Sequence, residues 1–253
     1  MRRDVHAREL AYHEEIYAGF AQRHFARPAV RAFRRHSAER IMRALGAGPG
    51  SRLLSIGCGI GDTELLLAPR VKEMVGLDLS PTAIRQARAD ARRLGVTNVR
   101  FEEGSLEEAA LEAGAFDGVF AIFLLHHLPD GELDRFPSAV ARLLAPGGGF
   151  YSLDPSRYRL TGAVGRLLIP RLMEKHQSPD ERELAPAKVR ELFARTGFEA
   201  EHRAYDFLST PLAGLFPSAA WLYRAARLVD EVLIRAPLVN RAGSNFEVVA
   251  RRR

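Results

Sequence analysis

The sequence predicts an α/β fold: a seven-stranded, mostly parallel sheet with helices on both faces and a partly helical cap. Three observations support this prediction. The mostly apolar run 53–56 leads into closely spaced glycines, which indicates a buried strand, a tight turn and a helix. A second apolar run ends at Asp78, and further strand-like runs alternate with helix-like segments. The run 116–123 is almost continuously apolar, as expected of a strand that is covered on both faces.

The composition indicates a single domain, residues 1–253. Of these residues 47% are apolar, enough for one substantial core with an appended lid. Cys58 is the only cysteine and lies in the glycine turn, so we expect no disulfide framework and no metal site. The first residues lack the apolar core of a signal peptide, and no run is long and uncharged enough to span a bilayer. We therefore expect a soluble, cytoplasmic protein.

The net charge of +6 comes almost entirely from arginine, since lysine occurs only at Lys72, Lys175 and Lys188. Abundant Ala, Arg, Gly and Leu with so little lysine is also what a GC-biased coding sequence would give. A solvated basic surface therefore explains the charge better than a nucleic-acid site does.

The N-terminal region is expected to be helical. Residues 4–25, which include Tyr17, precede the first strand and could fold over a bound ligand, although a simple aromatic surface helix is an equal alternative. Residues 28–45 have the apolar spacing of a clearer helix, which ends at the glycine-rich run 46–50. We predict that residues 1–45 form a lid.

The remaining elements follow from their start and stop signals. Ser80-Pro81 predicts an N-cap followed by proline at the first helical position, and the helix that starts there ends at Gly95. Further helices are expected at 130–144 and 186–196, and further strands at 96–102, 116–123, 150–154, 198–207 and 245–250.

The glycine turn indicates a nucleoside ligand. Gly57, Gly59 and Gly61 would let a ligand lie against bare backbone. Asp78 stands about twenty residues further on, the spacing at which a carboxylate meets ribose hydroxyls in nucleotide-binding βαβ units.

The charge of the turn indicates which nucleoside. Asp62 and Glu64 open the following helix, and two carboxylates would repel a pyrophosphate. They suit S-adenosylmethionine, which has no phosphate and carries a sulfonium and an ammonium. The Gly-x-Gly-x-Gly spacing and Asp62 also disfavour a nicotinamide-dependent oxidoreductase.

These motifs resemble the class I (Rossmann-like) S-adenosylmethionine-dependent methyltransferases, especially the bacterial small-molecule branch that includes the quinone-biosynthesis type. The resemblance covers residues 40–155 well and implies a cofactor-binding core at 46–155, with S-adenosylhomocysteine as the product. The residues that it assigns to the cofactor are Gly57, Cys58, Gly59, Gly61, Asp78 and Leu79, then Gly104, Ser105 and Leu106 near the adenine, Ala121 and Ile122 along the methionine moiety, and Tyr17 from the lid.

Two positions depart from the family pattern. Ser55 stands where the family commonly has Asp or Glu near the methionine end, and Ser105 takes the place of the usual adenine-contacting Asp. A serine hydroxyl can still accept a hydrogen bond, and Asp62 or Glu64 could supply the missing charge. These departures leave one alternative open, a non-catalytic protein that binds S-adenosylmethionine or a partner.

His126 and His127 follow the fourth expected strand, where the resemblance implies that the substrate chamber meets the cofactor. His127 occupies the position that is most often histidine in that pattern. Methyl transfer to a hydroxyl requires loss of a proton, and an imidazole with a pKa of about 6.5 can accept one at neutral pH. We predict catalytic roles for both residues; a histidine that only hydrogen-bonds the strand end is the equal alternative.

Two expected cap inserts, residues 156–185 and 208–243, follow strands whose carboxyl ends should face the cofactor. Both combine large aliphatic residues with arginines, which predicts an apolar, arginine-rimmed cap for a hydrophobic or amphipathic acceptor and, as a further option, contact with an anionic bilayer. One apolar stripe at helical spacing is more typical of core packing than of a ligand site. Its members are Trp221, Leu222, Ala225, Leu228, Val229, Val232 and Leu233.

The sequence thus predicts an enzyme of small-molecule biosynthesis. It would transfer a methyl group from S-adenosylmethionine to a small-molecule acceptor, with O-methylation of a hydrophobic or amphipathic hydroxyl compound favoured. The oligomeric state stays open.

Overall fold

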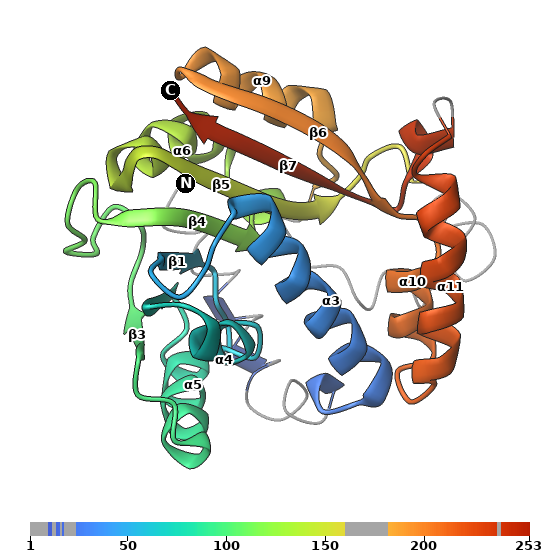
Figure 1. The fold of residues 1–253 in the computed structure, drawn as a ribbon, viewed down its shortest axis with the longest axis horizontal. Coiled ribbons are helices and arrows are strands. Elements are labelled where there is room, and N and C mark those ends of the chain that lie inside the picture. The colour runs from blue at the N-terminus through green and yellow to red at the C-terminus, as the bar shows by residue number, and fades with distance from the viewer. Residues whose placement is uncertain (1–9, 12–13, 16, 18–23, 160–181, 237–238) are drawn as a thin grey trace.

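The computed structural model describes residues 10–11, 14–15, 17, 24–159, 182–236 and 239–253. Within these residues the strands are β1 Arg52–Ile56, β2 Glu73–Asp78, β3 Val99–Glu103, β4 Phe116–Ile122, β5 Leu144–Pro155, β6 Phe198–Asp206 and β7 Asn245–Arg252. They form one sheet in the order β3-β2-β1-β4-β5-β7-β6 (Figure 1). Strand β7 is antiparallel to both β5 and β6, and the other pairs are parallel. The predicted seven-stranded, mostly parallel sheet is confirmed.

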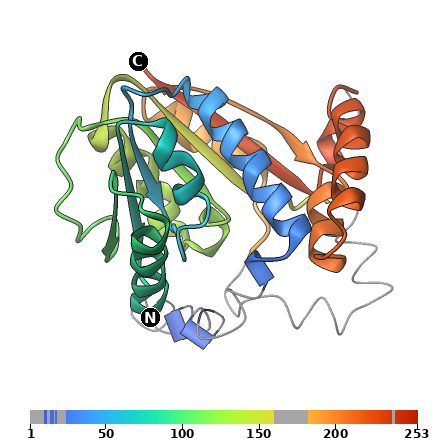
Figure 2. The ribbon, with the colours of Figure 1, turned by 60° about the horizontal axis from the view of Figure 1, so that its bottom comes forward.

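Helices cover both faces of this sheet. Side chains alternate along each strand, so Leu54 and Phe150 lie in a core with α6 and α9, whereas Leu53 and Tyr151 lie in a core with α3 on the opposite face. Figures 1 and 2 place α10 and α11 beside α3, at the opposite end of the molecule from α5. The bounds are α3 Pro28–Leu45, α4 Glu64–Leu67, α5 Pro81–Leu94, α6 Asp130–Leu143, α9 Pro186–Arg195, α10 Ser209–Leu215 and α11 Ala220–Leu233, with 3-10 helices η2 Ala68–Arg70, η3 Leu125–His127 and η4 Val239–Ala242.

The predicted start and stop signals of α5 are confirmed. The Ser80 hydroxyl accepts a hydrogen bond from the backbone N–H of Ala83 (3.0 Å), Pro81 occupies the first turn, and Gly95 ends the helix in the left-handed conformation (φ 67°). Strand β3 begins three residues later than expected. Asn98, just before it, donates side-chain hydrogen bonds to carbonyls of η2 and the residue that follows, so this stretch is a connection rather than a strand.

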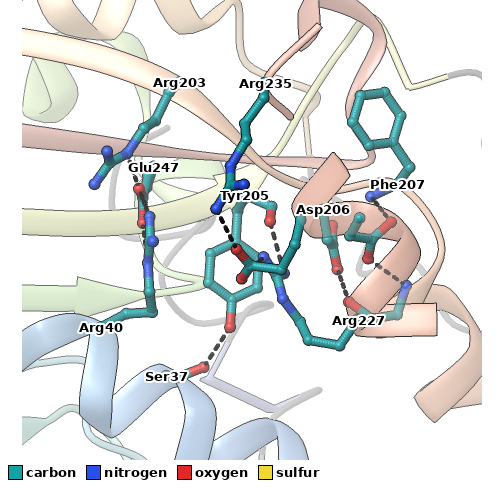
Figure 3. A network of polar contacts seen from close by, with 12 residues as sticks. Ser37, Arg40, Arg203, Tyr205, Asp206, Phe207, Arg227, Arg235 and Glu247 are labelled. Atoms are coloured by element: carbon teal, nitrogen blue, oxygen red, sulfur yellow. Dashed lines mark hydrogen bonds and ion pairs between the residues drawn. The ribbon is translucent and has the colours of Figure 1, made fainter. Parts of the chain in front are cut away.

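A buried carboxylate joins α3 to the antiparallel edge of the sheet. Glu247 on β7 is fully buried and pairs with Arg40 of α3 and Arg203 of β6 (Figure 3). The hydroxyl of Tyr151 on β5 donates to the same carboxylate (2.9 Å). A buried charge is tolerated only when it is paired and hydrogen-bonded, so these contacts fix the position of α3 against three strands.

The second insert forms α10 and α11, and the core-packing interpretation of its apolar stripe is wrong. Trp221, Leu228 and Val232 are 71%, 72% and 68% exposed. The buried face of α11 is instead held by polar contacts. Asp230 accepts hydrogen bonds from three backbone N–H groups, those of residues 207–209. Figure 3 shows the second contact, in which Arg227 donates to the Tyr205 carbonyl. Leaving these buried polar groups without partners would cost more free energy than leaving the apolar stripe exposed to water.

Two predicted segments fall largely outside the described residues: most of the helix expected at 4–25, and residues 160–181 of the first cap insert. Among the residues that are described, no helix combines the length and apolarity needed to cross a membrane.

Candidate active site

A cavity of about 480 Å³ lies at the carboxyl ends of the parallel strands, where sheets of this kind bind ligands. Residues that follow β1, β2, β3 and β4 all contribute to its wall, and α6 closes one side. Many of the residues predicted to form the site line this cavity, namely Tyr17, Gly57, Asp78, Leu79, Gly104, Ser105, Leu106 and His127.

The three glycines of the turn have left-handed backbone conformations, with φ of 72°, 54° and 74° at Gly57, Gly59 and Gly61. They serve different purposes. A Cβ on Gly61 would lie 2.5 Å from the Phe101 ring, so this glycine lets the turn pack against β3. A Cβ on Gly59 would lie 2.8 Å from the hydroxyl of Tyr17. Gly57 lies at the cavity itself.

Asp78 connects the turn to the start of α5. One carboxylate oxygen accepts the backbone N–H of Gly59 (2.7 Å) and the other accepts that of Ser80 (2.9 Å). A carboxylate offers about four lone pairs, so both oxygens can accept further hydrogen bonds. Asp78 also lines the cavity, so its carboxylate borders the space that a ligand would occupy.

The described part of the N-terminal region lies against the same edge. Glu14 hydrogen-bonds the hydroxyls of Ser80 and Thr82 and the backbone N–H of Thr82 (3.2 Å). Burial, aided by the negative charge of Asp78, raises the pKa of Tyr17 well above its ordinary value, so its hydroxyl stays protonated. Tyr17 therefore presents a neutral hydroxyl at the cavity wall beside Gly59.

A carboxylate stands beside Ser55, the first departure from the family pattern. Ser55 and Glu64 are both buried, and their side chains are hydrogen-bonded to each other. Burial raises the pKa of Glu64 to about 7, and the neighbouring Asp62 adds to the rise, while the bond with Ser55 opposes it. Asp62 itself forms an ion pair with Arg34 of α3 (2.9 Å). Glu64 thus places an acidic group where the first strand has none.

Ser105, the second departure, also has a carboxylate beside it. Its hydroxyl donates to Glu108 (2.8 Å), whose backbone N–H points back to the same hydroxyl (3.3 Å). Both residues line the cavity. The pair therefore brings a negative charge to the position where the family commonly has an aspartate.

The two predicted histidines have different environments. His126 is buried, and its Nδ1 lies 3.0 Å from the carboxylate of Asp154, which also accepts the His126 backbone N–H (3.3 Å). His127 lines the cavity, and its ring lies 4.0 Å from that of His126, measured between ring centres. The geometry suits His127 for contact with a ligand in the cavity. It suits His126 for holding the His127 ring in place.

Sequence reasoning missed much of the apolar wall. Phe123 has a left-handed backbone conformation (φ 55°), rare for a large side chain, and its ring stacks on Phe33 of α3 (5.9 Å between centres). Phe136 and Ala139 of α6 also line the cavity, one turn apart on the helix face shared with Glu132. The helical spacing could have grouped the α6 residues, but only the fold shows that they face the glycine turn.

Some predicted site residues lie behind the wall. Cys58 is buried, and burial raises the pKa of its thiol well above the ordinary value, which makes it a poor nucleophile. Ala121 is fully buried in the core under α6, and Ile122 packs partly buried on the α3 side. Their assignment to the cofactor stays a prediction, as does that of Gly59 and Gly61. The catalytic role of His126 likewise stays a prediction.

Comparison with known proteins identifies the core of the chain. Residues 53–148 match the family model described as a methyltransferase domain. The uncharacterized methyltransferase YcgJ of Bacillus subtilis is 34% identical over 103 residues, which are 41% of this chain and 40% of that protein. A ubiquinone biosynthesis O-methyltransferase of Xanthomonas axonopodis pv. citri is 30% identical over 161 residues, 60% of this chain and 64% of that protein. The chain therefore spans about 40% to 64% of the length of these two relatives.

Solved structures agree on the fold. The crystal structure of YcgJ superposes with a TM-score of 0.59 at 19% identity, covering 86% of this chain and 98% of that one. A geranyl diphosphate C-methyltransferase from Streptomyces coelicolor gives a TM-score of 0.59 at 17% identity, with 86% and 78% covered. Residues 53–148 therefore match the methyltransferase-domain family, and the solved structures show that the chain shares the fold of these proteins.

The first prediction concerns Asp78. Replacing it with alanine should weaken S-adenosylmethionine and S-adenosylhomocysteine binding by about 1.5 to 3 kcal/mol, roughly tenfold to a hundredfold, because a charge-assisted contact to ribose is lost. Titration calorimetry on the folded variant measures the change. Asp134→Ala, at an exposed position on α6, is the matched control. Unchanged affinity in a folded Asp78→Ala protein would refute the ribose assignment.

The second prediction concerns Glu64. Its folded-state pKa of about 7 lies above the ordinary 4.5, so the folded protein holds a proton that the unfolded chain releases. Stability should therefore fall as pH rises from 4.5 to 7. Glu64→Gln removes this loss. The free energy of unfolding of the variant minus that of the parent should therefore be more favourable at pH 8 than at pH 5, by on the order of 1 to 3 kcal/mol.

Denaturant unfolding of the ligand-free protein at the two pH values measures this difference. Glu112→Gln, at an exposed position, should show no such pH-dependent gain. An equal effect of Glu64→Gln at both pH values would contradict a buried carboxyl with a raised pKa.

Proposed function

We propose that the protein transfers a methyl group from S-adenosylmethionine to the hydroxyl of a hydrophobic or amphipathic small molecule. The observation that supports this most directly is the shared cavity. Asp78 beside the glycine turn, and His127 beside the apolar wall, both line it. A nucleoside contact and a proton acceptor thus face one shared space.

The residues present fit S-adenosylmethionine. Asp78 faces the cavity with a carboxylate, a group that suits ribose hydroxyls, and Ser105 with Glu108 offers polar contacts to an adenine edge. Glu64 lies behind the cavity wall beside the turn, and with a pKa of about 7 its ionised form is favoured by a cationic ligand rather than by a pyrophosphate. The cofactor, when bound, supplies a methyl group already activated by its sulfonium.

The protein's own contribution is then to position the acceptor and remove its proton. His127 is the proposed base at the cavity, because a neutral imidazole accepts a proton at neutral pH. Asp154 holds His126 through Nδ1, and His126 packs against His127, which limits the ring orientations open to His127. Holding the reacting groups in a fixed geometry can supply a large part of the rate gain in a displacement reaction.

An apolar acceptor fits the opposite wall. Leu106, Leu124, Leu128 and Phe136 all contribute to the lining. The relatives' names point the same way, since they include a ubiquinone biosynthesis O-methyltransferase, a demethylmenaquinone methyltransferase and a 2-heptyl-1-hydroxyquinolin-4(1H)-one methyltransferase. Molecules of this kind partition into membranes, so contact with a bilayer surface is part of the proposal.

The second candidate is a protein of the same fold without methyl transfer. Ser55 and Ser105 favour it, and a structure titled as a [4+2]-cyclase, SpnF, has this fold with a TM-score of 0.60 at 20% identity. Glu64 and Glu108 argue against it, because they restore acidic groups beside both serines.

The third prediction tests these candidates. Incubation of the protein with methyl-labelled S-adenosylmethionine and a panel of hydroxylated quinones, quinolones and small polar alcohols should label an apolar hydroxyl compound. Extraction into organic solvent and mass spectrometry locate the methyl group. Tight binding of S-adenosylmethionine without label transfer to any acceptor, including a cell extract, would favour the second candidate.

The fourth prediction concerns His127. His127→Ala should lower turnover about a hundredfold or more while changing cofactor affinity less than twofold, because the imidazole acts on the acceptor. His202→Ala, at an exposed position on β6, is the control and should change neither. Turnover equal to that of the parent at saturating acceptor would return His127 to a structural role.

A further inference from the structure

A second cavity, of about 410 Å³, lies between α3 and α11, and its lining is rich in cationic groups. Arg35 and His36 come from α3, and Arg224 and Arg227 from α11. None of these residues lines the cavity at the glycine turn. The family match covers residues 53–148, so the residues of the second cavity lie outside it on both sides, in α3 and in α11.

Arg227 is built into this cavity with a donor to spare. It is only 7% exposed. One terminal nitrogen donates to the Tyr205 carbonyl (2.8 Å) and the other to Glu231 (3.2 Å), as Figure 3 shows for the first contact. Its Nε meets no hydrogen-bond acceptor in the part of the chain that the structure describes. A buried cationic group with an unsatisfied donor is costly, and the charge of an anion in the cavity would lower that cost.

Within the described chain, His36 also has an unsatisfied buried nitrogen. Its Nε2 is buried and likewise has no hydrogen-bond partner among the described residues. Burial lowers the pKa of His36 to about 4, and the positive charges of Arg227 and Arg40 lower it further, with Arg43 in the same direction and Glu231 opposing. The site therefore disfavours another cation. It is suited to an anion with several oxygens, such as a phosphate group.

The surface around the cavity is apolar. Leu228, which lines it, is 72% exposed, and Trp221 and Val232 lie seven residues before and four residues after it on α11, with similar exposure. These spacings place all three on one helix face. Arg224 lies four residues before Leu228 and Arg235 lies seven residues after it. Cationic and apolar side chains therefore share that face. This is the pattern of a helix that lies in a membrane interface.

We infer that the α3–α11 cavity binds the phosphate group of an anionic phospholipid while Trp221, Leu228 and Val232 enter the bilayer surface. A free phosphate would explain the cations but not the exposed apolar face, and a zwitterionic surface would explain the apolar face but not the cations. The inference rests on the proposed use of a membrane-soluble acceptor and is independent of the methyl-transfer step.

The fifth prediction tests this with the full chain and sedimentation of lipid vesicles. The protein should bind vesicles of phosphatidylcholine mixed with phosphatidylglycerol and should bind pure phosphatidylcholine vesicles at least about tenfold more weakly. Moderate salt should weaken the binding. Trp221 is the only tryptophan in the chain, so its fluorescence should shift to the blue as it leaves water.

Two variants with matched controls locate the site. The double substitution Arg35→Glu and Arg224→Glu should reduce binding to the anionic vesicles by at least about tenfold, and Leu228→Ser with Val232→Ser should abolish the fluorescence shift. The controls are Arg93→Glu, which is 68% exposed on α5, and Leu94→Ser, which is 54% exposed. Both should bind as the parent does.

Each other outcome overturns the inference. Equal binding to the two vesicle types, or no effect of the Arg35 and Arg224 substitutions, removes the phosphate site. Binding of inorganic phosphate, seen by calorimetry, without binding to vesicles replaces the lipid by a soluble anion. Methyl transfer to a detergent-solubilised acceptor should be unchanged in these variants, so failure of this inference is distinguishable from failure of the proposed function.

Discussion

The site depends on one interaction. The Asp78 carboxylate accepts backbone hydrogen bonds both from the glycine turn and from the residue that begins α5. A glycine has more backbone conformations in the unfolded chain than any other residue. Fixing three of them at positive φ in one turn therefore costs much conformational entropy. Asp78 offsets part of that cost because it satisfies backbone donors from two neighbouring connections at once. The same carboxylate then faces the cavity, so the group that orders the turn also meets the ligand.

The electrostatics of the site depend on two serines, each of which is hydrogen-bonded to a neighbouring glutamate. Ser55 and Ser105 are uncharged where the family commonly has a carboxylate, but Glu64 and Glu108 stand beside them and are hydrogen-bonded to their side chains. The two carboxylates differ in consequence. Glu64 is buried, and its pKa of about 7 makes its charge sensitive to pH and to a nearby cation, whereas Glu108 is exposed at the cavity rim. A cationic ligand near Glu64 would therefore favour the ionised form.

Much of the fold could be predicted because its signals are local. The apolar run before Gly57, the Ser80-Pro81 cap and the Gly95 stop define their elements within a few residues, and the structure confirms them. The face of α11 could not be predicted, because it is decided by contacts of Arg227 and Asp230 with residues about twenty positions away. His126 and His127 likewise look alike in sequence, and only the distant Asp154 distinguishes the buried ring from the one at the cavity.

Helix α3 connects the two cavities. Phe33 stacks on Phe123 at the wall of the first cavity, and His36, less than one turn further on, lines the second. A helix rises about 1.5 Å per residue, so the two contacts lie only a few ångströms apart along its axis. The Arg40 pair with the buried Glu247 holds the next turn against the sheet. The two contacts therefore lie on neighbouring faces of one fixed helix, so the α3–α11 cavity lies close to the apolar wall of the first cavity.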